Sequence, residues 1–328
     1  MSTPAPAPAE DALRKDLSRQ QQRLRSALDT REDARLEHLL AEVDHALARI
    51  DKGSYGICDT CHDPIEKTTL AADPLICYCI DHLSEAERRH LESDLELAAR
   101  VQSRLLPEPS LREGGWEVAY RYEPMGPVGG DYCDLIRAPG DGFFFFLGDV
   151  SGKGVAASLL AAQLHGLFRT LVALDLPLDA MVERANRIFC ESVLAGHFAT
   201  LICGHASTSG ALDFINAGHP PPLLLSEGRA TALESGGHPL GMFCDGGYRA
   251  ERIRFSPRQS LLLYTDGLSE AAAPSSEEYG SARAARVASG PHTDAEALIA
   301  ACLADVAAFR GSARRTDDLT VMALHRTG

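Results

Sequence analysis

The chain has 328 residues and a formal net charge of −14 at pH 7. This length is enough for two or more folding units with a real core. The acidic balance and the lack of a long basic stretch exclude a protein that gains its main affinity from nucleic-acid phosphates, so we expect no direct nucleic-acid binding. No run approaches the roughly 18 uninterrupted apolar residues of a membrane span, and no secretion signal opens the chain. We therefore expect a cytoplasmic protein without a membrane contact.

The nine cysteines divide into two groups. Four of them cluster between Cys58 and Cys79, which in a reducing compartment indicates metal binding in place of disulfides. The other five are scattered singly through apolar segments, where cysteine is most often a small buried hydrophobe. These five are Cys133, Cys190, Cys203, Cys244 and Cys302.

The amino-terminal part is expected to be a short disordered start, residues 1–9, followed by a helical coil over residues 10–52. The helical pattern runs from Ala12 to Leu28 and again from Arg35 to Ile50. The segment 29–33 between them lacks Gly and Pro, so a hairpin tip and a continuous helix both stay open. The second helix carries an apolar seam with alternating spacings of four and three, typical of a two-helix coil: Leu36, Leu40, Val43, Leu47 and Ile50.

A small zinc finger is predicted over residues 53–83. Tetrahedral zinc sites favour knuckles with two residues between the ligands. Cys58 with Cys61 forms one such knuckle, and Cys79 with His82 forms the other, so we expect these four residues to hold one structural Zn2+. The alternative ligand set replaces His82 with Cys77. A cysteine so close to the knuckles also suggests a redox role for Cys77.

The finger resembles a known family. Residues 46–61 read Ala-Leu-Ala-Arg-Ile-Asp-Lys-Gly-Ser-Tyr-Gly-Ile-Cys-Asp-Thr-Cys, and Pro64-Ile65 and Pro74 precede Cys79. Together they resemble the zinc finger of the DksA/TraR family, over about residues 35–83. In that family the finger sits beside a helical coil that reaches into RNA polymerase, which implies a polymerase contact here. The family's acidic tip motif Asp-x-x-Asp-x-Ala is absent from this chain.

A linker helix is expected over residues 84–107. Ser84 followed by acidic residues is a helix-capping signature, and Pro107 stops the pattern. One face is charged and the other carries an apolar stripe. Such a stripe would either pack on the helix's own domain or join two copies into a homodimer. The stripe consists of Leu91, Leu95, Ala98, Val101 and Leu105.

The remaining residues, 108–328, form the second domain. Strand-like runs outnumber helical patterns and often lie close together, which favours an α+β fold of packed antiparallel sheets covered by helices over a wound βαβ fold. The expected strands are 116–122, 132–136, 143–150, 198–206, 212–215, 223–225, 253–255, 261–264 and 319–324. The expected helices are 156–173, 178–194 and 295–309.

A predicted hairpin in this domain brings two aspartates together. Two β-prone runs flank the turn signal Pro139-Gly140-Asp141-Gly142. With its tip near Gly140, the hairpin places Asp131 directly opposite Asp149. Like charges that face each other across a ladder are unfavourable. We therefore expect a divalent cation between them, because carboxylates and backbone carbonyls are hard oxygen ligands suited to Mg2+ or Mn2+.

Further aspartates stand at the ends of apolar strands. Asp266 directly follows the run 261–264, and Asp317 and Asp318 directly precede the run 319–324. Residues at strand ends can converge on one rim of a sheet, so these side chains could complete a metal cluster.

These segments closely resemble the SpoIIE/RsbU branch of the metal-dependent, PPM-type serine/threonine protein phosphatases. The resemblance covers nearly all of residues 90–326. The matching motifs are Ala-Arg-Val-Gln-Ser-Arg-Leu-Leu-Pro at 99–107, Gly-Gly-Asp at 129–131, Gly-Asp-Val-Ser-Gly-Lys-Gly at 148–154, Phe-Ala-Thr at 198–200, Asn-Ala-Gly-His-Pro-Pro at 216–221, Thr-Asp-Gly at 265–267 and Asp-Asp-Leu-Thr at 317–320.

The resemblance implies a PPM-type α-β-β-α sandwich and two bound Mn2+ or Mg2+ ions. In this chain Asp149 would bridge the ions. Asp131 and the carbonyl of Val150 would complete the protein ligands of one ion, and Asp266 and Asp317 those of the other. Asp318 is the less favoured ligand of its pair. Two such ions activate a shared water, so no Ser, Cys or His nucleophile is required.

Three hypotheses follow. The first is a protein phosphatase that acts on phosphoserine or phosphothreonine, with a phosphorylated STAS-type anti-anti-sigma regulator in a partner-switching pathway as the implied substrate. The second is a transcription regulator that binds RNA polymerase through the coil and finger and carries the phosphatase domain as an appendage. The third is a catalytically dead scaffold, against which the presence of all four expected aspartates argues.

Overall fold

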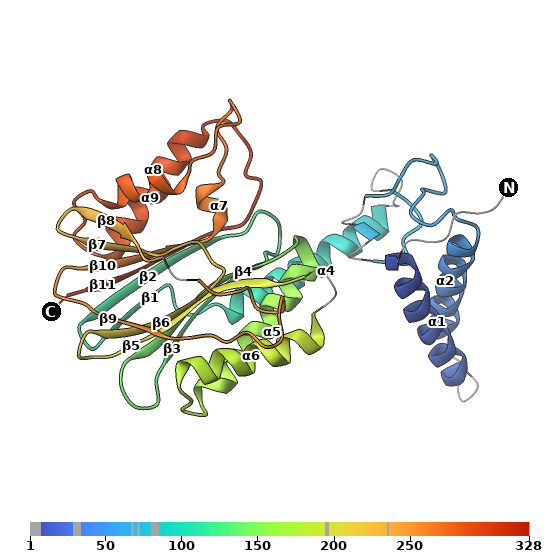
Figure 1. The fold of residues 1–328 in the computed structure, drawn as a ribbon. Helices are drawn as coiled ribbons and strands as arrows, with labels where there is room; N and C mark the ends of the chain where they lie inside the picture. Colours follow the sequence, from blue (N-terminus) through green and yellow to red (C-terminus); the bar gives the residue numbers. More distant parts are fainter. Residues whose placement is uncertain are drawn as a thin grey trace. The chain divides into compact units, whose positions relative to one another are not determined.

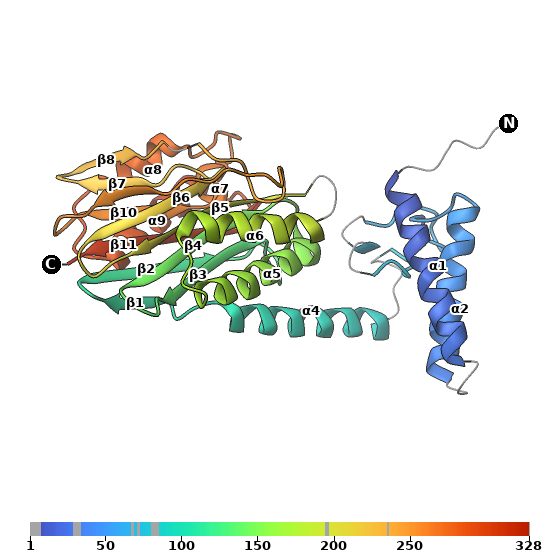
Figure 2. The same cartoon turned by 60° about the horizontal axis from the view of Figure 1, so that its bottom comes forward.

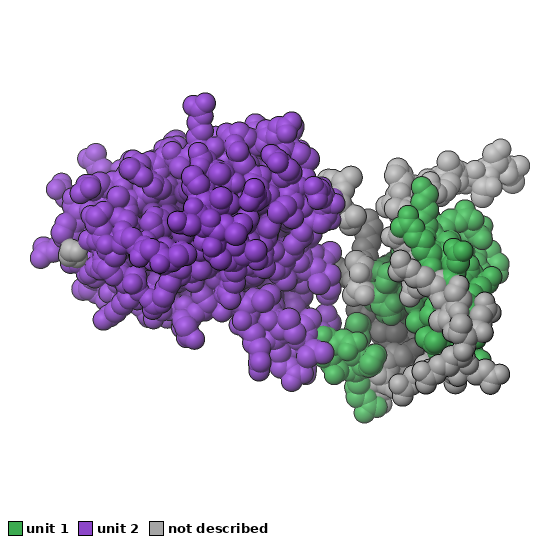
Figure 3. Space-filling view, turned by 90° about the horizontal axis from the view of Figure 1, so that it is seen from below, with its two compact units in different colours: residues 1–94 green, residues 95–328 purple. Residues whose placement is uncertain are grey.

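The structure, a computed structural model, describes residues 8–28, 34–66, 69–70, 73–79, 85–193, 197–234 and 236–327. The chain separates into two compact units, residues 1–94 and residues 95–328 (Figure 3). Each unit has its own hydrophobic clusters. We therefore describe them one at a time.

The first unit begins with two helices, α1 (Pro8–Leu28) and α2 (Ala34–Asp51). They pack side by side around Leu17, Val43 and Ile50, so the apolar seam predicted for the second helix is an internal interface (Figure 1). Cross-helix contacts set the direction: Arg14 pairs with Asp51, at 2.7 Å. Because an early residue of α1 meets the last residue of α2, the two helices form an antiparallel hairpin and not one continuous helix. The predicted tip, residues 29–33, lies outside the described residues.

The finger follows α2. Its first knuckle is closed by backbone hydrogen bonds, in which Cys58 N donates to Asp63 O and His62 N donates to Cys58 O. Ile57 and Pro64 form an isolated antiparallel bridge across it. Helix α4 (Glu85–Leu105) comes next and lies within the range predicted for the linker helix, with its end two residues before Pro107. The predicted capping residue Ser84 lies outside the described residues.

The second unit contains two antiparallel sheets. In the first, six strands follow the order β1-β2-β11-β10-β7-β8; in the second, five strands follow the order β3-β4-β5-β6-β9. The strands of the first sheet are β1 (Ser110–Glu113), β2 (Trp116–Glu123), β7 (Leu223–Ser226), β8 (Arg229–Ala232), β10 (Ser260–Tyr264) and β11 (Leu319–Arg326). Those of the second are β3 (Asp131–Arg137), β4 (Phe143–Val150), β5 (Ala199–Ala206), β6 (Ala211–Ala217) and β9 (Glu251–Arg254).

Helices cover the outer faces of both sheets (Figures 1 and 2). Helices α5 (Gly154–Val172) and α6 (Leu178–Ser192) lie on the five-stranded sheet, whereas α8 (Ser281–Ala288) and α9 (Ala295–Arg310) lie on the six-stranded sheet. A short helix, α7 (Asp266–Ser269), follows β10. The unit is therefore the α-β-β-α sandwich that the sequence predicted, with three layers of apolar packing.

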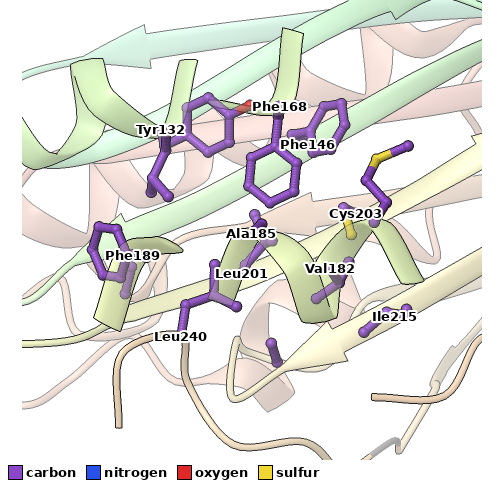
Figure 4. Packing of buried hydrophobic residues seen from close by; sticks show 14 of the residues in the cluster. Tyr132, Phe146, Phe168, Val182, Ala185, Phe189, Leu201, Cys203, Ile215 and Leu240 are labelled. Atoms are coloured by element: carbon purple, nitrogen blue, oxygen red, sulfur yellow. The ribbon is translucent and has the colours of Figure 1, made fainter. Parts of the chain in front are cut away.

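Alternation along the strands explains how one chain fills all three layers. In β4 the residues Phe143, Phe145 and Leu147 point into the space between the sheets, whereas Phe146 points outward against α5. Outside the five-stranded sheet, the ring of Phe146 lies 4.7 Å from that of Phe168 of α5, centroid to centroid (Figure 4). The run of four phenylalanines thus contributes to two apolar layers, one between the sheets and one between the five-stranded sheet and its helices.

Helix α5 is the one described helix long and apolar enough, by length and composition, to cross a membrane. Eight of its residues are buried in the unit, among them Leu164 and Phe168. Its apolar character is therefore explained by its contact with the sheet.

Candidate functional site

The predicted register of the hairpin is confirmed. β3 and β4 pair antiparallel, with Asp131 opposite Asp149 and Arg137 opposite Phe143. Both aspartates lie on the strand face that turns toward the other sheet, since Asp131 precedes Cys133 by two residues and Asp149 follows Leu147 by two. The two carboxylates therefore stand at one end of the space between the sheets.

Asp131 is held in place from the other sheet. Its Oδ2 accepts hydrogen bonds from the hydroxyls of Thr265, at 3.0 Å, and Thr320, at 2.5 Å. The two threonines are themselves tied together, because Thr320 N donates to Thr265 Oγ1. These bonds fix the orientation of a carboxylate that is 2% exposed. The sequence motifs contained both threonines, but their role was not predicted.

The ends of β10 and β11 bring the remaining aspartates to this location. β10 pairs with β11 with Tyr264 opposite Val321, so Asp266 and Asp317 emerge at the same end of the sheet. Both are close enough to Asp149 to raise its pKa. The structure therefore gathers two aspartates of the β3–β4 hairpin, Asp131 and Asp149, with Asp266 after β10 and Asp317 before β11.

The electrostatics of this group are unfavourable without a cation. Burial, followed by the charges of Asp266 and Asp317, raises the pKa of Asp149 from 3.8 to about 7. Burial and the charge of Asp149 hold the pKa of Asp131 well above its usual range. In the described part of the chain no basic side chain pairs with Asp149, and the ammonium of Lys153 instead contacts Asp317, at 2.7 Å. Such an excess of buried negative charge is stable only if something neutralises it.

The donor set also suits a hard divalent cation. A Cβ at Gly130 would lie 3.0 Å from the Val150 carbonyl oxygen, 3.0 Å from the Ala157 Cβ and 3.7 Å from Asp149 Oδ1. The Val150 and Asp149 oxygens therefore lie close to the same backbone position, which a side chain at residue 130 would crowd. An all-oxygen set of carboxylates and a carbonyl is the kind of site that Mg2+ and Mn2+ prefer.

Asp318 differs from its neighbour Asp317. Its Oδ1 accepts a hydrogen bond from Met125 N and its Oδ2 one from Gly130 N, both at 2.6 Å. Both oxygens are thus used to hold the loop that leads into Asp131. This geometry favours a positioning role for Asp318 over metal binding.

Helix α4 holds the same loop. The side chain of Gln102 accepts a hydrogen bond from Gly129 N, at 3.0 Å, and donates one to Gly129 O, at 2.7 Å. Gly129 itself tolerates no side chain, because a Cβ would lie 2.5 Å from the Tyr122 hydroxyl. Gln102 belongs to a motif noted in the sequence, but its hydrogen bonds could be found only from the fold.

His219 makes contacts within the fold. It is buried, and its Nδ1 lies 2.9 Å from Thr200 Oγ1. Burial lowers its pKa to about 3, so the ring stays neutral. Asn216 pairs with the backbone of His219 in both directions, which closes the loop after β6.

The finger presents a second group of metal-binding side chains. The sulfurs of Cys58, Cys61 and Cys79 all lie within 4.8 Å of one another. Burial alone would raise the pKa of Cys58, but backbone N–H groups from Cys61, Cys79 and Thr60 lower it to about 6, which favours the thiolate that a metal binds.

The sequence left two candidates, His82 and Cys77, for the fourth zinc ligand. The predicted His82 lies outside the described residues. The alternative, Cys77, does not join the three thiols; its sulfur groups instead with His45 and Asp59. The thiol cluster is therefore compatible with a structural Zn2+ and gives no support to Cys77 as its ligand.

The sequence was compared with known protein families and with individual proteins. The sequence profile described as Stage II sporulation protein E (SpoIIE) matches residues 139–327, more than half of the chain. The chain is 29% identical over 181 residues to Phosphoserine phosphatase RsbP of Bacillus subtilis, a match that covers 53% of this chain and 45% of that protein.

A solved structure supports the fold. The SiaA-PP2C domain of Pseudomonas aeruginosa aligns with a TM-score of 0.64 at 21% identity, over 74% of this chain and 99% of that domain. The amino-terminal part is similar to RNA polymerase-binding transcription factor DksA of Caulobacter vibrioides, 35% identical over 63 residues, which is 19% of this chain and 44% of that protein. The chain spans 41% to 55% of the length of the three curated relatives that match its phosphatase region.

The raised pKa of Asp149 predicts a pH dependence of stability in metal-free protein. Because the folded state holds this proton more tightly than the unfolded state, the free energy of unfolding falls as pH rises from about 4 to 7. Asp149→Asn removes the charge, so the metal-free variant should exceed the wild type in stability by about 1–2 kcal/mol at pH 8 and by less at pH 4. Urea unfolding in a chelator checks this. The matched control is Asp175→Asn in an exposed turn; a pH-independent difference for Asp149→Asn would contradict the account.

The thiol cluster predicts one tightly bound zinc per chain after metal-replete expression. Cys58→Ser should lower the zinc content to well below one, because it removes a buried ligand, whereas Cys77→Ser should keep one zinc. Elemental analysis of purified protein measures both. The assignment is wrong if the wild type carries no zinc or if Cys77→Ser loses it.

Proposed function

Since the chain belongs to the SpoIIE family of PPM-type serine/threonine phosphatases, we propose that it hydrolyses phosphoserine or phosphothreonine in a protein substrate with two Mn2+ or Mg2+ ions. The observation that carries this proposal is the convergence of four aspartates at one end of the sandwich, with Asp131 and Asp149 directly opposed and, in the described part of the chain, no basic side chain paired with Asp149.

The proposed ligands divide between two ions. Asp149 would contribute to both. Asp131 and the Val150 carbonyl would hold one ion, which is supported by the closeness of Val150 O and Asp149 Oδ1 to the same backbone position at Gly130. Asp266 and Asp317 would hold the other. When bound, such a pair of ions supplies a water of lowered pKa and positive charge for the phosphoryl oxygens.

The chain's own residues keep this site in shape. The hydroxyls of Thr265 and Thr320 hold Asp131 by one oxygen, which leaves its other oxygen for a ligand role. Asp318 and Gln102 hold the backbone before Asp131. No histidine or cysteine is needed as a nucleophile, and the neutral, buried His219 is consistent with that.

The substrate class follows from the relatives and from the sequence resemblance. RsbP carries the name phosphoserine phosphatase, which supports phosphoserine here. A phosphorylated STAS-type regulator in a partner-switching pathway is the substrate that the resemblance favours. A cytoplasmic location is part of this proposal.

A second candidate function rests on the amino-terminal unit. Its similarity to DksA and its cluster of three thiols favour an RNA polymerase contact through the coil and finger. In this alternative the chain regulates transcription and the phosphatase unit is appended. Retention of the full chain on immobilised RNA polymerase core would support it, and loss of binding on removal of residues 1–83 would locate the contact.

Mn2+-dependent hydrolysis tests the enzymatic proposal. The wild type should release phosphate from p-nitrophenyl phosphate and from a phosphorylated STAS-type protein with Mn2+ and not with a chelator. Asp149→Asn should lower kcat by about 100-fold or more, because it removes the bridging carboxylate. Asp141→Asn, at the exposed tip of the same hairpin, serves as the matched control and should keep full activity. Equal rates for the wild type and Asp149→Asn, or no activity in either with metal supplied, would sink the proposal.

We also propose that α4 joins two copies of the chain. Leu97 and Val101 stand one turn apart on this helix and are 54% and 56% exposed, while the neighbouring Gln102 is turned into the phosphatase unit. Exposed apolar residues at this spacing suit a helix-to-helix contact. Sedimentation should show a dimer that dissociates in the Leu97→Asp, Val101→Asp double variant. Leu159→Asp, at an exposed position of α5, should stay dimeric; a monomeric wild type at micromolar concentration would refute the proposal.

A further inference from the structure

A small arginine-lined cavity, about 30 Å³ in volume, lies beside the aspartate cluster, and Arg314, one of its lining residues, is exposed. One wall comes from α7 and the residues after it, including Gly267 and Glu270. The other wall comes from the segment that leads into β11 and includes Arg310, Arg314, Arg315 and Asp317. Both walls start from residues proposed to bind metal, since Gly267 follows Asp266 directly. The cavity is therefore an extension of the candidate active site.

The local fold brings the arginines to one place. Helix α9 ends at Arg310, and the chain reverses at Gly311, whose φ of 54° is a conformation that favours glycine. Ala313 N then donates to Arg310 O, at 3.0 Å, which closes the turn. As a result Arg314 returns to the same cavity wall as Arg310.

Two of the three guanidinium groups have free hydrogen-bonding capacity. Arg315 is committed, because it donates to the Glu123 carboxylate at 2.7 Å and to the Pro124 carbonyl at 3.1 Å. Within the described ranges neither Arg310 nor Arg314 has a side-chain hydrogen bond or an ion pair. A guanidinium that lines a cavity without a partner is suited to bind a planar oxyanion from another molecule.

The position of the cavity limits which oxyanion this is. Of the four clustered aspartates only Asp317 lines it. A phosphoryl group that reacts at metal ions bound by the four aspartates would therefore lie beside the cavity and not inside it. Among the charged residues of the lining, Arg315 is paired with Glu123 and Asp317 is paired with Lys153. Arg310 and Arg314 are therefore opposed by Glu270 alone, and the lining favours a negatively charged group on the substrate.

We propose that Arg310 and Arg314 form an oxyanion subsite that binds an acidic side chain next to the phosphorylated residue of the substrate protein. The inference rests on the proposed function and adds to it a preference among substrates. The subsite makes the two arginines determinants of specificity; they do not touch the reacting phosphate. A carboxylate is the occupant because the reacting phosphate lies outside the cavity and guanidinium groups bind an acidic side chain in a planar, bidentate geometry.

Steady-state kinetics with three probes test the subsite. The probes are a phosphoserine peptide flanked by aspartates, the same peptide with alanines in their place, and p-nitrophenyl phosphate. In the Arg310→Gln, Arg314→Gln double variant, KM for the acidic peptide should rise by about five- to tenfold with little change in kcat. KM for the other two probes should change by less than twofold. Arg229→Gln, on exposed strand β8, is the matched control and should resemble the wild type.

Each outcome decides between the subsite and its rivals. Equal losses on all three probes would assign the arginines to the reacting phosphate and overturn the proposal, and so would unchanged kinetics on the acidic peptide. The rate on p-nitrophenyl phosphate also shows that the variant is folded and active. If the wild type hydrolyses none of the probes with Mn2+ present, the proposed function fails, whereas activity without acidic preference rejects the subsite alone.

A competition experiment supplies an independent measurement. An unphosphorylated acidic peptide should inhibit hydrolysis of p-nitrophenyl phosphate by the wild type, and the double variant should require several-fold more peptide for the same inhibition. Equal inhibition of both proteins would contradict the subsite.

Discussion

The repulsion between Asp131 and Asp149 is the constraint on which the second unit depends. The β3–β4 register places the two carboxylates face to face. Asp266, at the end of β10 in the opposite sheet, is close enough for its charge to raise the pKa of Asp149, and its own pKa is raised by burial and by Asp317. A fold gains nothing from such a group by itself. The arrangement is explained by a site for divalent cations. Bound cations would offset the repulsion between the carboxylates that destabilises the metal-free fold.

Much of the surrounding structure serves to keep this group in place. The two threonines fix Asp131 from the six-stranded sheet, and Asp318 fixes the backbone of Gly130 from the same sheet. Gln102 adds a pair of hydrogen bonds from α4 to Gly129. The loop before Asp131 is thus held from α4 by Gln102 and from the start of β11 by Asp318. Any change that displaces α4 from the unit would act on this loop first.

Helix α4 has a second attachment that reaches the hairpin from another side. Arg169 of α5 donates a hydrogen bond to the carbonyl of Leu105, at 3.0 Å. Its Nε also donates one to the Asp134 carboxylate of β3, at 2.7 Å. Asp134 is fully buried, and although burial would raise its pKa, His165 and Arg169 lower it. The end of α4 is therefore joined through one arginine to the strand that begins with Asp131.

The sequence allowed the hairpin register, the α-β-β-α architecture and the gathering of the four aspartates to be predicted, because turn signals, strand alternation and a family resemblance all depend on local patterns. Short edge elements escaped notice: β1 and β8 have four residues each and little apolar content. The partners of Asp131, Thr265 and Thr320, could not be inferred from spacing, since they come from a sheet that only the fold brings near. The same holds for Gln102 and for the paired Arg310 and Arg314, whose neighbours are set by tertiary packing.

Anomalous X-ray scattering from crystals grown with Mn2+ tests the central claim most directly. The account predicts two manganese peaks about 3.5–4 Å apart, with the Asp149 carboxylate in contact with both. A single peak, or peaks whose ligands do not include Asp149, would contradict it.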